Sequence, residues 1–202
     1  MQTNNYKNLT GINISKLNGN VNFESITERN IDIVYIKATY GHTFIDPYFE
    51  INVQNAKKNS LLVGFYHTFR PSSEELAIKQ ANHFINTIRN YPCDCKVALN
   101  IENANNLPYT KVTTLCNIFL NEVKKLSNLD VVIYTTTTFI ERNLKKSLSM
   151  YPLWVIQESN RNFIDNGIWD NWIGFQHLDK KITNGLTTST HLSDFTSDIL
   201  LS

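Results

Sequence analysis

Short apolar runs recur along the chain, and segments with apolar residues at helical spacing separate most of them. The run from Ile31 to Thr39 is apolar on both faces, which is typical of a buried strand in a parallel sheet. The first run instead alternates, because Gly11, Asn13 and Ser15 share one face and two isoleucines share the other. Strands are expected at residues 11–15, 31–39, 61–69, 97–102, 131–134 and 152–157, and more loosely at 172–176 and around 191–192.

Helix signals lie between these runs. Asp46 and Pro47 form a helix-start signal, with Asp as the cap and Pro in the first turn, and this helix is expected to run to about Asn59. Residues 72–75, Ser-Ser-Glu-Glu, supply caps and first-turn acids for the next helix. Further helices are expected at 23–29, beyond Pro108 and at 139–148, whereas 159–170 and 180–190 are expected to be loops.

Strand and helix alternate from residue 11 to about residue 150. Such alternation indicates βα units with right-handed crossovers and a parallel sheet. About eight strands favour closure of the sheet, so the expected fold is α/β: a single irregular TIM-like barrel of mostly parallel strands, with fewer helices in the C-terminal third. The 202 residues show no internal boundary, so one domain over 1–202 is expected, with 1–9 as an N-terminal extension.

Charge and composition exclude several classes of protein. A net charge of +1 predicts no field that would steer nucleic acid, and the sequence lacks the run of about 18 apolar residues that a membrane-spanning helix needs. Neither nucleic acid nor a membrane is therefore an expected partner. The first ten residues are polar and rich in Asn, so no signal peptide is expected. The protein is expected to be made in the cytoplasm, and any action outside the cell would need another route of release.

The histidines and cysteines show no metal-ligand spacing, so neither a metal nor a cofactor is expected. Cys93 and Cys95 flank one aspartate, and Cys116 makes the number of cysteines odd. Free thiols are expected, and a bridge from Cys116 to one of the others is the alternative.

The strand at 97–102 carries the candidate chemistry. Its alternation places Asn100 and Glu102 on one face, at the C-terminal end where parallel α/β proteins house their sites. A carboxyl group there, beside an apolar floor, suits a proton donor, because desolvation favours the protonated form. The alternative is that Glu102 caps the loop that follows.

Eight short segments follow one another along the chain: 11–15 (GINIS), 35–39 (YIKAT), 46–49 (DPYF), 63–67 (VGFYH), 99–102 (LNIE), 133–135 (IYT), 152–155 (PLWV) and 175–176 (FQ). Together they resemble glycoside hydrolase family 25, the lysozymes of phage endolysins, bacterial autolysins and clostridial spore-lytic enzymes. The resemblance implies an irregular eight-stranded α/β barrel that hydrolyses the β-1,4 bond between N-acetylmuramic acid and N-acetylglucosamine. It further implies peptidoglycan glycan strands as the partner, and action at the cell wall or spore cortex.

The chain departs from the family pattern at its acidic positions. Asn13, Asn100 and His191 stand where the family has Asp, and Tyr40 stands where it has Glu. Of the acidic cluster that the resemblance implies, only Glu102, at the position of the general acid, is kept. A histidine that merely fills space is the alternative for His191.

The resemblance also implies a set of groove-lining residues, namely Tyr66, Tyr134, Trp154 and Gln176, and Tyr40 is a further substrate-binding candidate. Barrel filling is the alternative for these side chains. A lysozyme-like hydrolase with weak or lost activity is therefore expected, and a glycan-binding module of the same fold is the alternative.

Overall fold

A computed structural model describes residues 8–158, 166–183 and 185–201. Its strands form a closed barrel, because the sheet order β1-β9-β8-β7-β6-β5-β4-β2 returns to its start through pairing of β1 with β2. The strands are β1 (Leu9–Ile14), β2 (Ile33–Tyr40), β4 (Leu62–Thr68), β5 (Val97–Asn100), β6 (Val131–Thr136), β7 (Leu153–Gln157), β8 (Gly174–Ile182) and β9 (Thr190–Phe195). The short strand β3 (Phe44–Ile45) pairs with β2 outside this ring. The expected irregular α/β barrel is confirmed.

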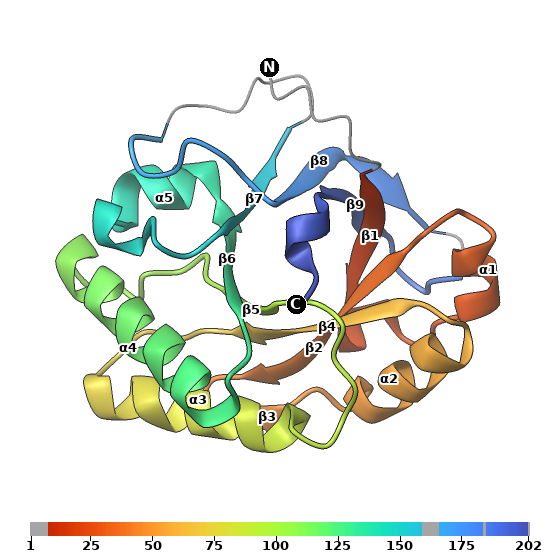
Figure 1. Ribbon diagram of the computed structural model, residues 1–202, viewed down its shortest axis with the longest axis horizontal. Helices are drawn as coiled ribbons and strands as arrows, with labels where there is room; N and C mark the ends of the chain where they lie inside the picture. Colours follow the sequence, from red (N-terminus) through yellow and green to blue (C-terminus); the bar gives the residue numbers. More distant parts are fainter. Residues whose placement is uncertain (1–7, 159–165, 184, 202) are drawn as a thin grey trace.

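All neighbours in the barrel are parallel except β9, which runs antiparallel to both β8 and β1. The helices are α1 (Phe23–Thr27), α2 (Phe49–Lys58), α3 (Glu74–Ile88), α4 (Tyr109–Ser127) and α5 (Thr137–Asn143), with 3-10 turns at Lys16–Asn18, Lys146–Leu148 and Ser197–Ile199. In Figure 1, α2 to α5 lie along the outside of the barrel, on the side of β2 to β6. None of the described helices has the length and apolarity needed to span a bilayer.

Several boundaries differ from expectation; the helix expected at 139–148, for example, is α5 followed by a separate 3-10 turn. The strand expected at 97–102 ends at Asn100. Helix α2 begins at Phe49, because the Asp46 carboxylate accepts the backbone N–H groups of Tyr48 and Lys16 and closes the preceding turn. Strand β8 continues through residues expected to be a loop, since Ile182 pairs with Thr190 on the antiparallel strand β9.

Alternation along the strands divides the core into two layers. Outward residues such as Ile12 and Ile14, which the alternation placed on one strand face, pack against the helices. Inward residues fill the barrel, where Tyr35 and Trp154 lie with ring centroids 4.7 Å apart. Glycine makes room for them: a Cβ at Gly64 would lie 2.5 Å from the Tyr35 ring. One end of the barrel interior is therefore filled by aromatic side chains.

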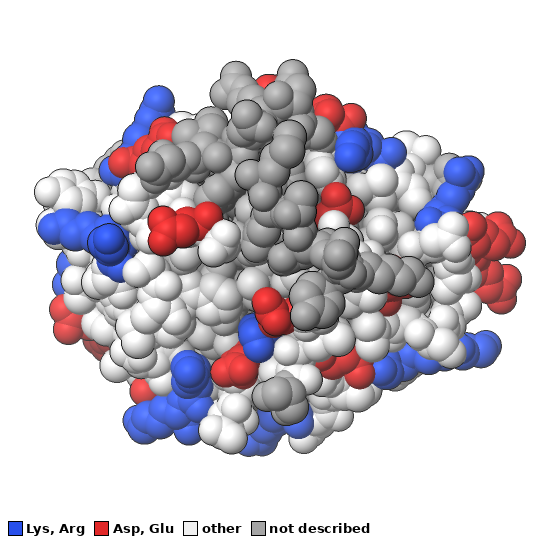
Figure 2. Space-filling view, turned by 45° about the horizontal axis from the view of Figure 1, so that its top comes forward, with Lys and Arg blue, Asp and Glu red and all other residues white. Residues whose placement is uncertain are grey.

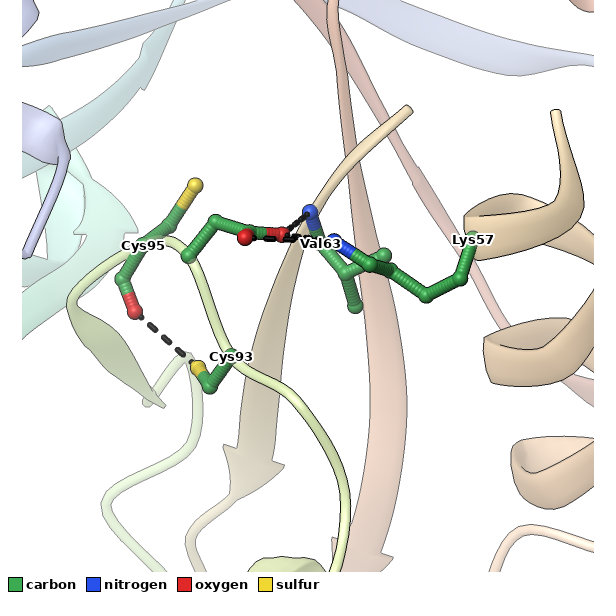
Figure 3. A network of polar contacts seen from close by, with 5 residues as sticks. Lys57, Val63, Cys93 and Cys95 are labelled. Carbon is green, nitrogen blue, oxygen red and sulfur yellow. Dashed lines mark hydrogen bonds and ion pairs between the residues drawn. The ribbon is translucent and has the colours of Figure 1, made fainter. Parts of the chain in front are cut away.

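A network of polar contacts holds the connection into β5 near the N-terminal ends of β4 and β5 (Figure 3). The Asp94 carboxylate there accepts a hydrogen bond from Lys57 Nζ at 2.8 Å and one from the Val63 backbone N–H at 2.7 Å. Cys93 Sγ donates to the Cys95 carbonyl oxygen at 3.2 Å, and burial raises the pKa of the Cys93 thiol to about 12. All three cysteines are free, which confirms that expectation and removes the alternative of a bridge from Cys116.

Surface charge is mixed in sign. On the face shown in Figure 2, basic and acidic side chains are interspersed. This distribution is consistent with the small net charge and gives this face no single-sign field.

Candidate active site

The candidate site is a pocket of about 330 Å³ at the C-terminal ends of the parallel strands. Barrel enzymes house their chemistry at this end, because residues from several strands converge there. The polar or aromatic residues that line the pocket include Asn13 from β1, Lys37 from β2, Tyr66 and Thr68 from β4, Asn100 and Glu102 at the end of β5, Tyr134 from β6, and Thr190 and His191 from β9. Asn13, Tyr66, Asn100, Glu102, Tyr134 and His191 were all predicted from the sequence, and the fold brings them together.

The Glu102 carboxylate is held by the amide of Asn100. Asn100 Nδ2 donates to Glu102 Oε1 at 2.9 Å, while Asn100 Oδ1 accepts from Thr68 Oγ1 at 3.2 Å. The loop that follows is closed by Asn103, whose Oδ1 accepts the Asn105 N–H at 2.8 Å. Asn103, and not Glu102, therefore caps this loop. Glu102 is an exposed residue that lines the pocket wall.

A second chain of hydrogen bonds crosses the barrel beneath the pocket. Tyr134 Oη donates to Gln176 Oε1 at 2.6 Å, and Gln176 Nε2 donates to Asn13 Oδ1 at 2.5 Å. The Asn13 backbone carbonyl accepts from Thr190 Oγ1 at 2.6 Å. Burial raises the pKa of the Tyr134 phenol, so it stays neutral and donates. Because Asn13 acts only as an acceptor toward Gln176, an aspartate would fit the same contact.

Two expected groove residues lie deeper than predicted. Trp154 is 0% exposed and stacks under Tyr134, with ring centroids 3.8 Å apart. Gln176 is 3% exposed and lies between Tyr134 and Asn13. Neither is among the pocket-lining residues, so they support the floor of the pocket from below and the barrel-filling alternative applies to Trp154.

Tyr40 lies outside this pocket, in an adjoining cleft of about 860 Å³. It is 38% exposed, and its hydroxyl accepts a hydrogen bond from Arg70 Nη1 at 3.4 Å. Its place in the cleft keeps it available to a bound molecule.

His191 is half-buried on the pocket wall. Burial lowers the pKa of its imidazole, and the nearby Lys181 lowers it further. His191 is therefore a neutral group at pH 7 and supplies no negative charge where the family has an aspartate.

Lys37 is the charged residue among the pocket-lining residues that the sequence analysis missed. It lies on β2 in line with Ile33 and Tyr35, and it pairs in register with Tyr66. Burial lowers the pKa of its ammonium group, and the nearby carboxylates of Asp46 and Glu102 oppose that shift. The sequence contained a signal for this inward position. Lys37 shares a strand face with two residues that fill the barrel, so its side chain also lies on the inward face, near the mouth of the barrel.

The charges of the pocket limit its chemistry. Of its lining residues in the described part of the chain, Glu102 alone carries a carboxylate. Glu102 can donate or accept a proton, whereas Asn13 and Asn100 supply only neutral acceptors and donors. No group of three or more metal-ligating side chains occurs among the described residues.

Comparison with known proteins was made for both sequence and fold. The sequence profile described as glycosyl hydrolases family 25 matches residues 12–186. The autolytic lysozyme of Clostridium acetobutylicum is 32% identical over 197 residues, which cover 96% of this chain and 57% of that protein. This chain therefore spans little more than half the length of that relative.

Solved structures share the fold over nearly the whole chain. A family 25 lysozyme from Aspergillus fumigatus matches with a TM-score of 0.82 at 26% identity, covering 95% of each chain. The spore cortex lytic enzyme SleM of Clostridium perfringens matches with a TM-score of 0.88, covering 99% of this chain and 71% of that one, and at 23% identity it shows the fold alone. The chain belongs to the glycosyl hydrolases family 25.

Proposed function

We propose that this chain is a lysozyme-like protein that holds peptidoglycan glycan strands in the pocket around Glu102 and hydrolyses them weakly or not at all. The bond addressed is the β-1,4 bond between N-acetylmuramic acid and N-acetylglucosamine. Family membership and the names of its relatives, an autolytic lysozyme and a spore cortex lytic enzyme, support the substrate class. The observation that carries the proposal is the Asn100–Glu102 pair, an amide beside the pocket's single carboxylate.

Hydrolysis needs a proton for the leaving oxygen and a group that stabilises the cationic sugar centre. Glu102 lies on the pocket wall and supplies the proton. Where a second carboxylate would stabilise the sugar cation, the pocket offers the amides of Asn13 and Asn100 and the neutral ring of His191. Losing one placed electrostatic stabiliser costs about 10²- to 10³-fold in rate.

The substrate offers a partial remedy. Its own N-acetyl group can attack the anomeric carbon, so a protein nucleophile is not obligatory. The pocket must then orient that acetamide and stabilise the charged ring that it forms, and a neutral amide does this poorly. The effects of the three replacements do not simply multiply, because groups that act as one unit are not additive.

A glycan-binding module without hydrolysis is the second candidate. The observation that favours it is the character of the lining, in which Tyr66, Tyr134, Asn13 and Thr68 present aromatic and uncharged polar groups. Such surfaces bind sugars without a carboxylate. In either case the protein would act at the cell wall or spore cortex.

Purified cell walls and spore cortex test the proposal. Reducing-end release and loss of turbidity are measured for the wild type, for Glu102→Gln, and for a control, Glu141→Gln, which alters an exposed residue of α5. Slow release that only Glu102→Gln abolishes supports weak hydrolysis. Co-sedimentation with walls and no release supports the binding module, whereas neither binding nor release would refute the proposal.

A further inference from the structure

Three basic side chains line the cleft beside the pocket, and no acidic side chain lines it in the described part of the structure. We propose that it binds a carboxylate-bearing peptide chain attached to the glycan strand, and so makes the site selective for peptide-substituted sugars. This inference rests on the proposed function and adds the part of the substrate that the cleft recognises. We call it the cationic cleft, and define it by Lys16, Lys37, Tyr40, Phe44 and Arg70.

The cationic cleft adjoins the pocket that holds Glu102. Both are lined by Lys37, which lies at the border between them. The volume of the cleft, about 860 Å³, exceeds the 330 Å³ of the pocket. A sugar in the pocket would therefore direct a substituent into a space large enough for several amino acid residues.

Each of the three basic side chains rests against an aromatic group. Lys16 Nζ lies 4.7 Å from the centroid of the Phe44 ring, and Lys37 Nζ lies 5.6 Å from that of Tyr40. Arg70 Nη1 donates to the Tyr40 hydroxyl at 3.4 Å. Such contacts position a cation but do not neutralise its charge.

No acidic side chain is among the residues that line the cleft in the described part of the structure. Within that part, none of the three basic side chains makes an ion pair. The nearby Asp46 carboxylate is 2% exposed and accepts backbone N–H groups of Lys16 and Tyr48. The cleft thus presents three positive charges to a bound molecule, with the buried Asp46 carboxylate behind them and the Glu102 carboxylate of the neighbouring pocket near Lys37.

The chemistry of the occupant follows from this lining. Lysine and arginine groups that make no ion pair bind anionic oxygen groups. Because the cleft borders the sugar pocket at Lys37, we expect the bound anion to be joined to a sugar. In peptidoglycan the lactyl group of N-acetylmuramic acid carries a peptide that ends in free carboxylates. N-acetylglucosamine carries no such group and leaves the cleft empty.

Two disaccharides that differ in this substituent test the inference. The first is N-acetylglucosaminyl-N-acetylmuramyl peptide with free carboxylates, which lacks the bond that a muramidase breaks. The second is N,N′-diacetylchitobiose, which is neutral. Dissociation constants are measured by calorimetry for the wild type, for the double variant Lys16→Gln/Arg70→Gln, and for a control double variant, Lys58→Gln/Lys124→Gln.

The two double variants lose the same charge, and all four residues are exposed, so folding is expected to be unaffected. Lys58 and Lys124 line neither the cleft nor the pocket. Thermal unfolding of each variant checks that the fold is retained.

We expect the wild type to bind the peptide-bearing disaccharide about tenfold more tightly than diacetylchitobiose. This advantage should fall to about twofold or less in Lys16→Gln/Arg70→Gln and in about 1 M salt, and persist in the control. Equal binding of the two sugars by the wild type, or an advantage that survives in Lys16→Gln/Arg70→Gln, overturns the inference. Tighter binding of poly(glycerol phosphate) than of the peptide-bearing sugar overturns the choice of carboxylate. If neither sugar nor cell walls bind, the proposed function itself fails.

Discussion

Replacing Asn100 by aspartate would restore two adjacent carboxylates, and the structure gives the size of the effect. Asn100 Nδ2 lies 2.9 Å from Glu102 Oε1, so an oxygen in its place would turn a hydrogen bond into a repulsive contact. With charge centres about 4 Å apart, two carboxylates repel by about 1 kcal/mol in bulk water and about 4 kcal/mol at an effective dielectric constant of 20. Because Glu102 is exposed, about 1–2 kcal/mol is expected.

The repulsion exists only when both carboxyl groups are ionised. Asn100→Asp should therefore lose about 1–2 kcal/mol of unfolding free energy at pH 7 relative to wild type, and much less at pH 4, where the pair retains a proton in the folded state. Urea unfolding at both pH values measures the difference. The pair would also hold the proton that glycoside hydrolysis needs.

A matched control separates this effect from added charge alone. Asn103→Asp adds a carboxylate one residue after Glu102, and its oxygen can still accept the Asn105 N–H. Its stability should change little between pH 4 and pH 7 relative to wild type. The reasoning is refuted if Asn100→Asp and Asn103→Asp show the same pH dependence.

Three further perturbations test other parts of the structure. The triple change Asn13→Asp, Asn100→Asp, His191→Asp should raise hydrolysis of cell walls at least about 100-fold, and no gain in reducing-end release would mean that more than the carboxylates has diverged. Burial lowers the pKa of the His67 imidazole to about 3, so the unfolded chain binds an extra proton below about pH 6.5 and stability should fall from there toward pH 3. Thermal unfolding of His67→Gln should show a shallower decline, and an equal slope would contradict the assignment. Gly64→Ala places a Cβ 2.5 Å from an aromatic ring and should lower the free energy of unfolding in urea by about 1–3 kcal/mol. Stability equal to that of the wild type would show that the side chains in the barrel interior rearrange to make room for the methyl group.

Much of the fold follows from alternation along the strands. The alternation of Gly11, Asn13 and Ser15 with two isoleucines predicted the two faces of β1, and in the structure both isoleucines lie in one core layer. The same reasoning placed Asn100 and Glu102 at one strand end, where the structure joins them by a hydrogen bond. Both follow from a period of two residues, which is a local property of the chain.

The depth of a side chain in the barrel and the length of strand pairing depend on other parts of the chain. The pattern within one strand did not predict either of them. Alternation places Trp154 and Gln176 on the inward face but does not tell how far below the mouth of the barrel they lie, and both are buried. Strand β8 extends to Ile182 through polar residues because the next strand, β9, folds back on it, and its own residues do not show this pairing. Alternation places Lys37 on the inward face of β2, but the carboxylates near it come from other segments and cannot be located from its own strand.

The central claim is that one carboxylate, Glu102, remains in a sugar pocket whose other acidic positions are uncharged. Its most direct test is the initial rate of reducing-end release from purified peptidoglycan, measured beside the family 25 lysozyme of Aspergillus fumigatus. We predict a rate at least about 100-fold below that of the comparison lysozyme. A rate within about tenfold of that lysozyme, or a measurable rate that Glu102→Gln leaves unchanged, would contradict the account.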